Sequence, residues 1–155
     1  MAAKRRTIDP GMLENVTNNM FHVLPLLRKR MFHLDVVQSE HGIPFSHVQV
    51  LAMLDDVGTM SVSEISRGLG IAKPNITPLV DRLITAGLVE RSRDSSDRRV
   101  VNVVILPAGR ERLTAVRESI SKQVGEWAEE LRVADFVELN ESLESLTRIL
   151  GMLRA

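Results

Sequence analysis

The sequence predicts one mainly α-helical domain of the α+β class, in which long helical regions flank a head of short helices and one β-hairpin. Apolar residues repeat every three or four positions over most of the 155 residues, as they do on one face of a helix. Glycines separate two short helical segments near residue 70. Between residues 88 and 106 this period is lost, and β-branched residues flank a polar tip, which favours a hairpin.

Composition limits the class of protein. The chain is 44% apolar and 26% charged and has no cysteine, which describes an ordinary globular domain without disulfides, cysteine zinc sites or thiol redox switches. We therefore expect a cytoplasmic protein. The N-terminal ten residues are basic but have no apolar stretch behind them, so we expect no secretion signal and no membrane span.

The first 58 residues are predicted to form two helices. The first begins at Asp9-Pro10, runs for about 25 residues and bends at Pro25, which removes a backbone hydrogen bond. Residues 41–44 break the pattern. The second helix is expected from Ser46, capped by its hydroxyl with Gln49 as the capping-box partner, to about Gly58.

The next two helices are short and close together. Ser61 and Glu64 form a second capping-box signal, and Gly68 and Gly70 end that helix within about two turns. Residues 71–86 are predicted to form the next helix, whose apolar face packs against the apolar face of the preceding helix. A hairpin follows, with its tip at residues 94–97. The buried set is Ile65, Leu69, Ile71, Ile76, Leu79, Val80 and Leu83.

The C-terminal region is predicted to be two long helices. Pro107 begins a helix of some 25 residues, and Asp135 begins the last one. From Phe136 to Leu153, leucines and one phenylalanine alternate in steps of three and four, which is a heptad seam that needs a facing helix.

Helix, glycine turn, helix and hairpin is the order of a winged helix-turn-helix, in which the second helix enters the major groove of DNA. Lys73, Asn75 and Thr77 lie near the N-terminal end of that helix, where asparagine can bond adenine through two contacts. Arg91, Arg93, Arg98 and Arg99 crowd the hairpin, where arginine can neutralise phosphates or enter a narrow minor groove. The alternatives are a solvated hairpin and a local capping role for Asn75.

The distribution of charge agrees with this interpretation, although the net charge is zero. Residues 58–112 carry nine basic and six acidic side chains, whereas residues 113–155 carry five and eight. The excess of positive charge lies in the head.

The chain resembles the MarR family of winged-helix transcription regulators, most specifically over residues 65–111 with the motifs VDRL, GLVER and DRR. The resemblance implies a single domain over 1–155, with a DNA-binding head at 46–106 and dimerisation helices at 7–45 and 107–155. It implies a recognition helix at 72–86, carrying Lys73, Pro74, Asn75, Thr77 and Arg82, and wing arginines Arg98 and Arg99. It also implies a small aromatic or phenolic effector.

Three positions depart from the family pattern. Ala72 lacks the usual capping hydroxyl, and Leu106 replaces a capping threonine before Pro107. Pro78 stands in the recognition helix where a basic or polar residue is more usual, so we expect a narrower readable surface.

We therefore expect a homodimeric, ligand-responsive repressor that binds a near-palindromic operator, with half-sites about 10 base pairs apart. No catalytic motif is present, so we expect no enzyme and no cofactor. His41 and His47 are six positions apart, which is no familiar zinc spacing, and His22 and His33 are eleven apart and so on one face of the predicted helix. The alternatives are a winged-helix protein-interaction module without DNA binding and a metal-responsive regulator.

Overall fold

The computed structural model describes residues 8–30, 34–93 and 101–152, and the chain divides into two compact units, Met1–His33 and Leu34–Ala155. The first unit contributes helix α1, Pro10–Arg30, which continues through Pro25. Several of its apolar side chains, among them Leu13, Val16 and Met20, are more than half exposed within the single chain.

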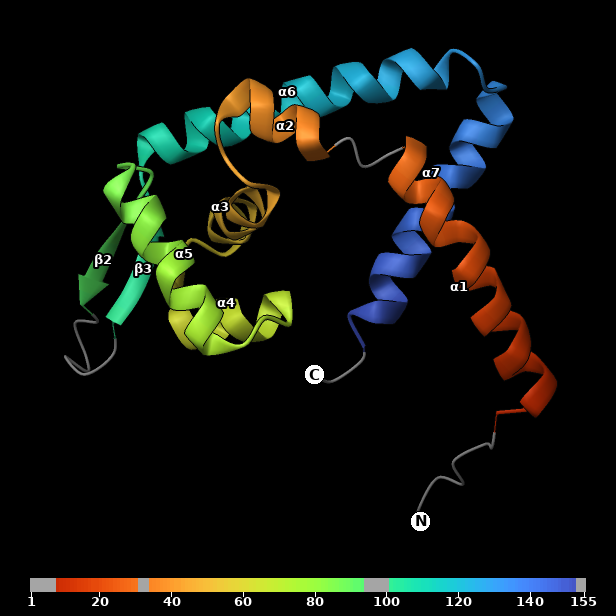
Figure 1. Ribbon diagram of the computed structural model, residues 1–155, viewed down its shortest axis with the longest axis horizontal. Coiled ribbons are helices and arrows are strands. Elements are labelled where there is room, and N and C mark those ends of the chain that lie inside the picture. The colour runs from red at the N-terminus through yellow and green to blue at the C-terminus, as the bar shows by residue number, and fades with distance from the viewer. Residues whose placement is uncertain (1–7, 31–33, 94–100, 153–155) are drawn as a thin grey trace. The chain divides into compact units, whose positions relative to one another are not determined.

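The second unit contains six helices and three strands within the described residues (Figure 1). Their bounds are α2 Leu34–His41, α3 Phe45–Val57, β1 Thr59–Ser61, α4 Val62–Leu69, α5 Lys73–Thr85, β2 Val89–Arg93, β3 Val101–Ile105, α6 Pro107–Ala128 and α7 Val133–Leu150.

The predicted hairpin is part of a three-stranded antiparallel sheet in the order β1-β3-β2. In the register, Val89 pairs with Ile105 and Thr59 pairs with Val104. The strands β2 and β3 confirm the two predicted arms, whereas β1 has no signal of its own because it is only three residues long.

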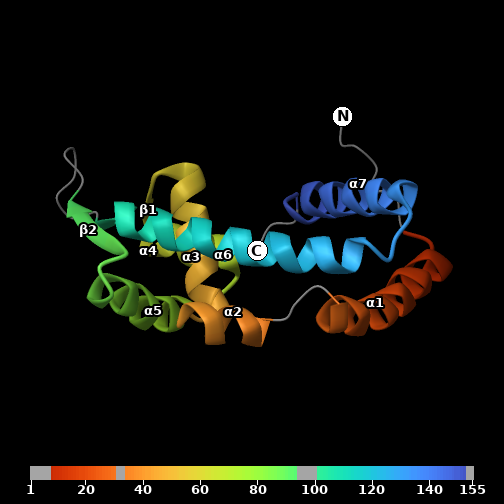
Figure 2. The same cartoon turned by 90° about the horizontal axis from the view of Figure 1, so that it is seen from above.

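The core lies between α3, α4, α5, the sheet and the first half of α6. Leu51, Leu54, Ile65, Ile76 and Val80 have no exposed surface, and α3 packs against α4, α5 and the part of α6 near the sheet (Figure 2). Gly109 on α6 permits a close approach, because a Cβ there would collide with the Leu88 carbonyl oxygen. The head therefore has its own hydrophobic core.

Two predicted helix boundaries are wrong. Helix α3 begins at Phe45 with Pro44 at the N-cap and no side-chain cap, because Ser46 already lies inside the helix and its hydroxyl is 3.4 Å from Nδ1 of His47. Helix α7 begins at Val133, two residues before Asp135. The predicted N-terminal helix begins at Pro10 as expected, and its predicted end falls near residues 31–33, which lie outside the described residues between α1 and α2.

Candidate nucleic-acid interface

Local hydrogen bonds fix the start of the short helix α4 and the turn that joins it to α5. The Ser61 hydroxyl accepts a hydrogen bond from the Glu64 amide at 3.3 Å, and the Glu64 carboxylate accepts one from the Ser61 amide at 2.7 Å, so the predicted capping box is confirmed. Gly70 ends α4 at φ 63°, a conformation that favours glycine. Ser66 Oγ then donates to the Ile71 carbonyl at 2.7 Å, which fixes the start of the connection to α5.

One face of α5 is buried and the other is open. Ile76, Leu79, Val80 and Leu83 face the core, as predicted. Lys73, Pro74, Asn75 and Arg82 are exposed, and Thr77 is half-buried with its hydroxyl donating to the Lys73 carbonyl at 3.2 Å. Five of the predicted site residues thus lie on one helix.

The N-terminus of α5 offers fewer amide donors than an ordinary helix start. Ala72 occupies the N-cap without a side-chain hydrogen bond, as predicted. Pro74 has no N–H, and the Asn75 N–H already donates to the Ala72 carbonyl at 2.8 Å. An anion at this end would therefore find less than the usual set of free amides.

The hairpin is tied to α5 by an ion pair. Arg91 Nη2 on β2 lies 2.6 Å from Asp81 Oδ1 on α5, and both side chains are about half exposed. A pair this exposed contributes little to stability, but it fixes the direction of Arg91. Arg93 is the last residue of β2, and Arg98 and Arg99 lie outside the described residues.

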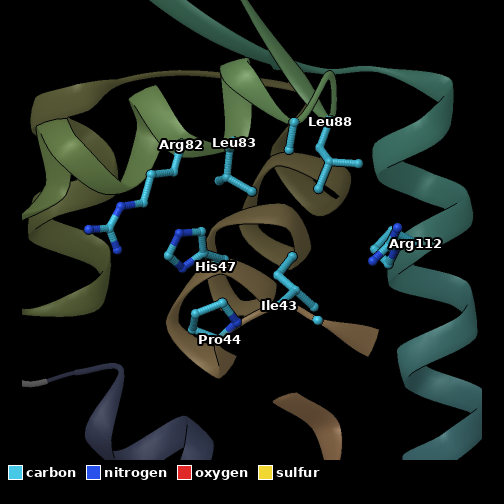
Figure 3. Close-up of a pocket in the computed structure, with 9 residues that line it drawn as sticks. Ile43, Pro44, His47, Arg82, Leu83, Leu88 and Arg112 are labelled. Carbon is cyan, nitrogen blue, oxygen red and sulfur yellow. The ribbon is translucent and has the colours of Figure 1, made fainter. Parts of the chain in front are cut away.

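A cavity of about 260 Å³ lies at the other end of α5 (Figure 3). It has apolar walls from Ile43, Leu83 and Leu88, and Arg82 of α5 and Arg112 of α6 line it from opposite sides, with the Arg82 guanidinium directed away from Leu88 and Arg112. Arg112 also donates to the His41 carbonyl. Gly42, Pro44, His47 and Ala86 complete its lining.

His47 of α3 is the buried polar residue of this cavity, with 7% of its surface exposed. Burial lowers the pKa of its imidazole, and the positive charge of Arg82 lowers the pKa further. The ring is therefore neutral at pH 7, so the two arginines carry the positive charge of the cavity.

Helix α6 is joined to α3 by an arginine cluster that sequence reasoning missed. Asp55 Oδ2 lies 3.0 Å from Arg117 Nη1, and Asp55 Oδ1 lies 3.4 Å from Arg110 Nε. The sequence indicates only that Asp55 lies near the end of a helix. Its partners lie 55 and 62 positions away and have no local signal.

Comparisons with known proteins identify the family. The sequence model of the MarR family matches residues 41–100. An uncharacterized HTH-type transcriptional regulator of Bacillus subtilis, YcgE, is 30% identical over 110 residues, which cover 71% of this chain and 70% of the relative. The chain belongs to the MarR family.

Solved structures of MarR-type proteins share the fold. The transcriptional regulator BldR from Sulfolobus solfataricus is 25% identical, with a TM-score of 0.74 over 91% of this chain and 98% of its own. A MarR family protein from Bacillus stearothermophilus is 21% identical, with the same TM-score over 94% of this chain and 99% of its own. The head is therefore a winged helix-turn-helix, with α4 and α5 as its two helices and β2 and β3 as its wing.

Membership of the MarR family makes the chain a transcription regulator of the DNA-binding kind. Its relatives are regulators rather than enzymes. No helix in the described part of the chain has the length and apolar content needed to cross a membrane. Within residues 8–30, 34–93 and 101–152, no three histidine, aspartate or glutamate side chains gather into a group that could hold a metal ion.

Proposed function

We propose that this MarR-family chain is a homodimeric repressor that inserts α5 into successive major grooves of a near-palindromic operator. The observation that supports this most directly is the division of α5 into a buried apolar face and an exposed face, with the wing fixed beside it by Arg91 and Asp81. A helix that is anchored on one side and open on the other can enter a groove without disturbing the core.

The proposed contacts divide into base and backbone contacts. Asn75 and Lys73, with Pro74 and Thr77 beside them, lie at the exposed N-terminal end of α5 and are proposed to face base edges. Arg93, Arg98 and Arg99 are proposed to bind phosphates or the minor groove from the wing. Arg91 donates a hydrogen bond to Asp81 on α5. We therefore propose that Arg91 positions the wing relative to α5 and does not itself contact DNA.

Dimerisation is proposed to use the helices whose apolar surface the single chain leaves uncovered. Phe21 and Leu24 of α1 are 74% and 56% exposed, and Leu146 and Leu150 of α7 are 47% and 52% exposed. Contiguous apolar stripes of this kind mark an interface. A two-fold dimer would present two α5 helices about one DNA turn apart.

The cavity beside Arg82 is proposed to bind a small aromatic or phenolic effector, preferably an anionic one. Ile43, Leu83 and Leu88 would pack on a single ring, and the positive charges of Arg82 and Arg112, which line the cavity from different helices, would favour a negative charge on it. Arg82 also belongs to α5, so an occupant of the cavity would act on the reading helix directly. Such a ligand releases DNA only if it binds the DNA-incompetent state more tightly.

Salt-titrated binding to random duplex DNA tests the proposal. We expect measurable affinity in dilute buffer that falls steeply as salt rises, because phosphate contacts release counterions. Replacing Arg98 and Arg99 together with alanine should weaken binding and flatten the salt dependence, whereas Arg132→Ala, on an exposed residue before α7, should change neither. A protein-docking module would bind no duplex at any salt concentration, and a metal-responsive regulator would retain metal in elemental analysis.

A further inference from the structure

The first half of the outward ridge of α5 carries two prolines instead of side chains that form hydrogen bonds. Ile76, Leu79, Val80 and Leu83 define its buried face, so a rotation of about 100° per residue places Pro74, Pro78, Asp81 and Thr85 along the opposite side. All four are exposed. Two proline rings, one turn apart, therefore form the first half of this ridge.

The side chains of Thr77, Asp81 and Thr85 each make a hydrogen bond within the protein. Thr77 Oγ1 donates to the Lys73 carbonyl at 3.2 Å, and Thr85 Oγ1 donates to the Asp81 carbonyl at 2.9 Å. The Asp81 carboxylate accepts from Arg91 at 2.6 Å. Proline contributes neither an N–H nor a side-chain polar atom. At Pro74 and Pro78 the ridge therefore presents the methylene groups of proline rings, where a polar side chain would present hydrogen-bond donors.

Only one base has an apolar group in the major groove. Thymine carries a 5-methyl group there, whereas the other bases present nitrogen and oxygen donors and acceptors. A donor on the ridge could discriminate among those patterns, but a proline ring can discriminate only by contact and exclusion of water. The methyl group of thymine is the complementary partner.

We propose that Pro78, together with Pro74, is a specificity-determining residue that recognises thymine through its 5-methyl group. This inference rests on the proposed function, since it assigns a role to the helix that enters the groove. Asn75 lies on the flank of the ridge and reads a neighbouring base by hydrogen bonds. The preferred half-site therefore contains thymine where the middle of α5 lies, and its recognition there depends on shape.

Replacement of thymine by deoxyuracil tests this directly, because it removes the methyl group and leaves every hydrogen-bonding atom in place. The duplex is the one preferred by the full-length protein in selection from a randomised pool. With deoxyuracil at one thymine of a single half-site we expect a loss of about fourfold in affinity, and with the same change in both half-sites a loss of about fifteenfold, as for the burial of one or two methyl groups. Deoxyuracil at thymines outside the half-sites is the DNA control.

Pro78→Ala identifies the residue responsible. Alanine withdraws the Cγ and Cδ atoms and restores the backbone N–H, so the variant keeps α5 helical. We expect Pro78→Ala to bind the thymine and deoxyuracil duplexes with equal affinity at the affected position. Pro107→Ala, which makes the same change at the exposed start of α6, should keep the full difference.

The outcomes separate this inference from the proposed function. Equal binding of both duplexes by the unchanged protein overturns the inference and leaves the proposed function standing. Full deoxyuracil sensitivity in Pro78→Ala overturns the assignment to Pro78. Failure to bind any duplex in dilute buffer overturns both.

Discussion

The winged head of this MarR-family chain buries its apolar side chains, whereas helices α1 and α7 leave most of theirs exposed. In the head, Leu51, Leu54 and Ile65 have no exposed surface, and they hold α3, α4 and α5 together. In α7 no residue is buried, and α1 likewise leaves its stripe exposed. The head is stabilised within one chain, whereas the long helices have apolar surface that a second chain can cover. Stability and assembly can therefore be altered separately.

The largest expected effect is on the core of the head. Leu54→Ala removes a fully buried side chain from α3, so we expect the free energy of unfolding to fall by about 2–5 kcal/mol. Chemical denaturation followed by circular dichroism measures this. Val57→Ala, at a 65% exposed position of the same helix, should change stability little. Similar losses in both variants would contradict the assignment of the core.

Charge on the α7 stripe should affect assembly and spare the head. Leu146→Glu with Leu150→Glu places two carboxylates in the proposed interface, and we expect the dimer dissociation constant to rise at least about a hundredfold. Sedimentation equilibrium measures it. Ser145→Glu, on the side of α7 away from the heptad seam, is the control. A variant that stays dimeric, or whose head unfolds as a monomer, would show that the two regions are not separate.

Loss of the cap before α4 should have a moderate effect on the head. Ser61→Ala removes the hydroxyl that accepts from the Glu64 amide, and we expect a loss of about 1 kcal/mol in stability. Ser63→Ala lies on the same helix outside the capping box and is the matched control. An unchanged thermal midpoint in Ser61→Ala would show that this cap does not stabilise the head.

The smallest expected effect is a pH dependence that arises from His47. Burial and then Arg82 lower its pKa in the folded chain, so the unfolded chain binds this proton more readily. Stability should therefore be lost as pH falls through the ordinary histidine range near about pH 6.5. His47→Gln should reduce this loss in denaturation curves measured between pH 7.5 and 5.5. Identical slopes in both proteins would contradict a depressed pKa.

Local signals predicted the parts of the head that local contacts stabilise. The Ser61–Glu64 capping box and the turn at Gly70 involve residues three to five positions apart, and the apolar period of α5 lies within one helix. These were correct from sequence. The missing cap at Ala72 was also predicted, because it depends on one residue type.

The parts that sequence did not predict depend on distant partners. Strand β1 is defined by its pairing with β3, some 40 residues later, and the Asp55 cluster joins α3 to α6. The cavity at Arg82 is assembled from residues between Gly42 and Arg112. The helix start at Phe45 was missed because the conformation of Pro44 determines it, while Ser46 offered a stronger local signal.

Hydroxyl-radical footprinting of the selected duplex with the intact protein tests whether one dimer places two α5 helices in successive major grooves. Two α5 helices from one dimer should protect two segments on the same side of the DNA, with centres about 10 base pairs apart, at a stoichiometry of two chains per duplex. A single protected segment bound by one chain, or an unprotected duplex at low salt, would contradict this placement.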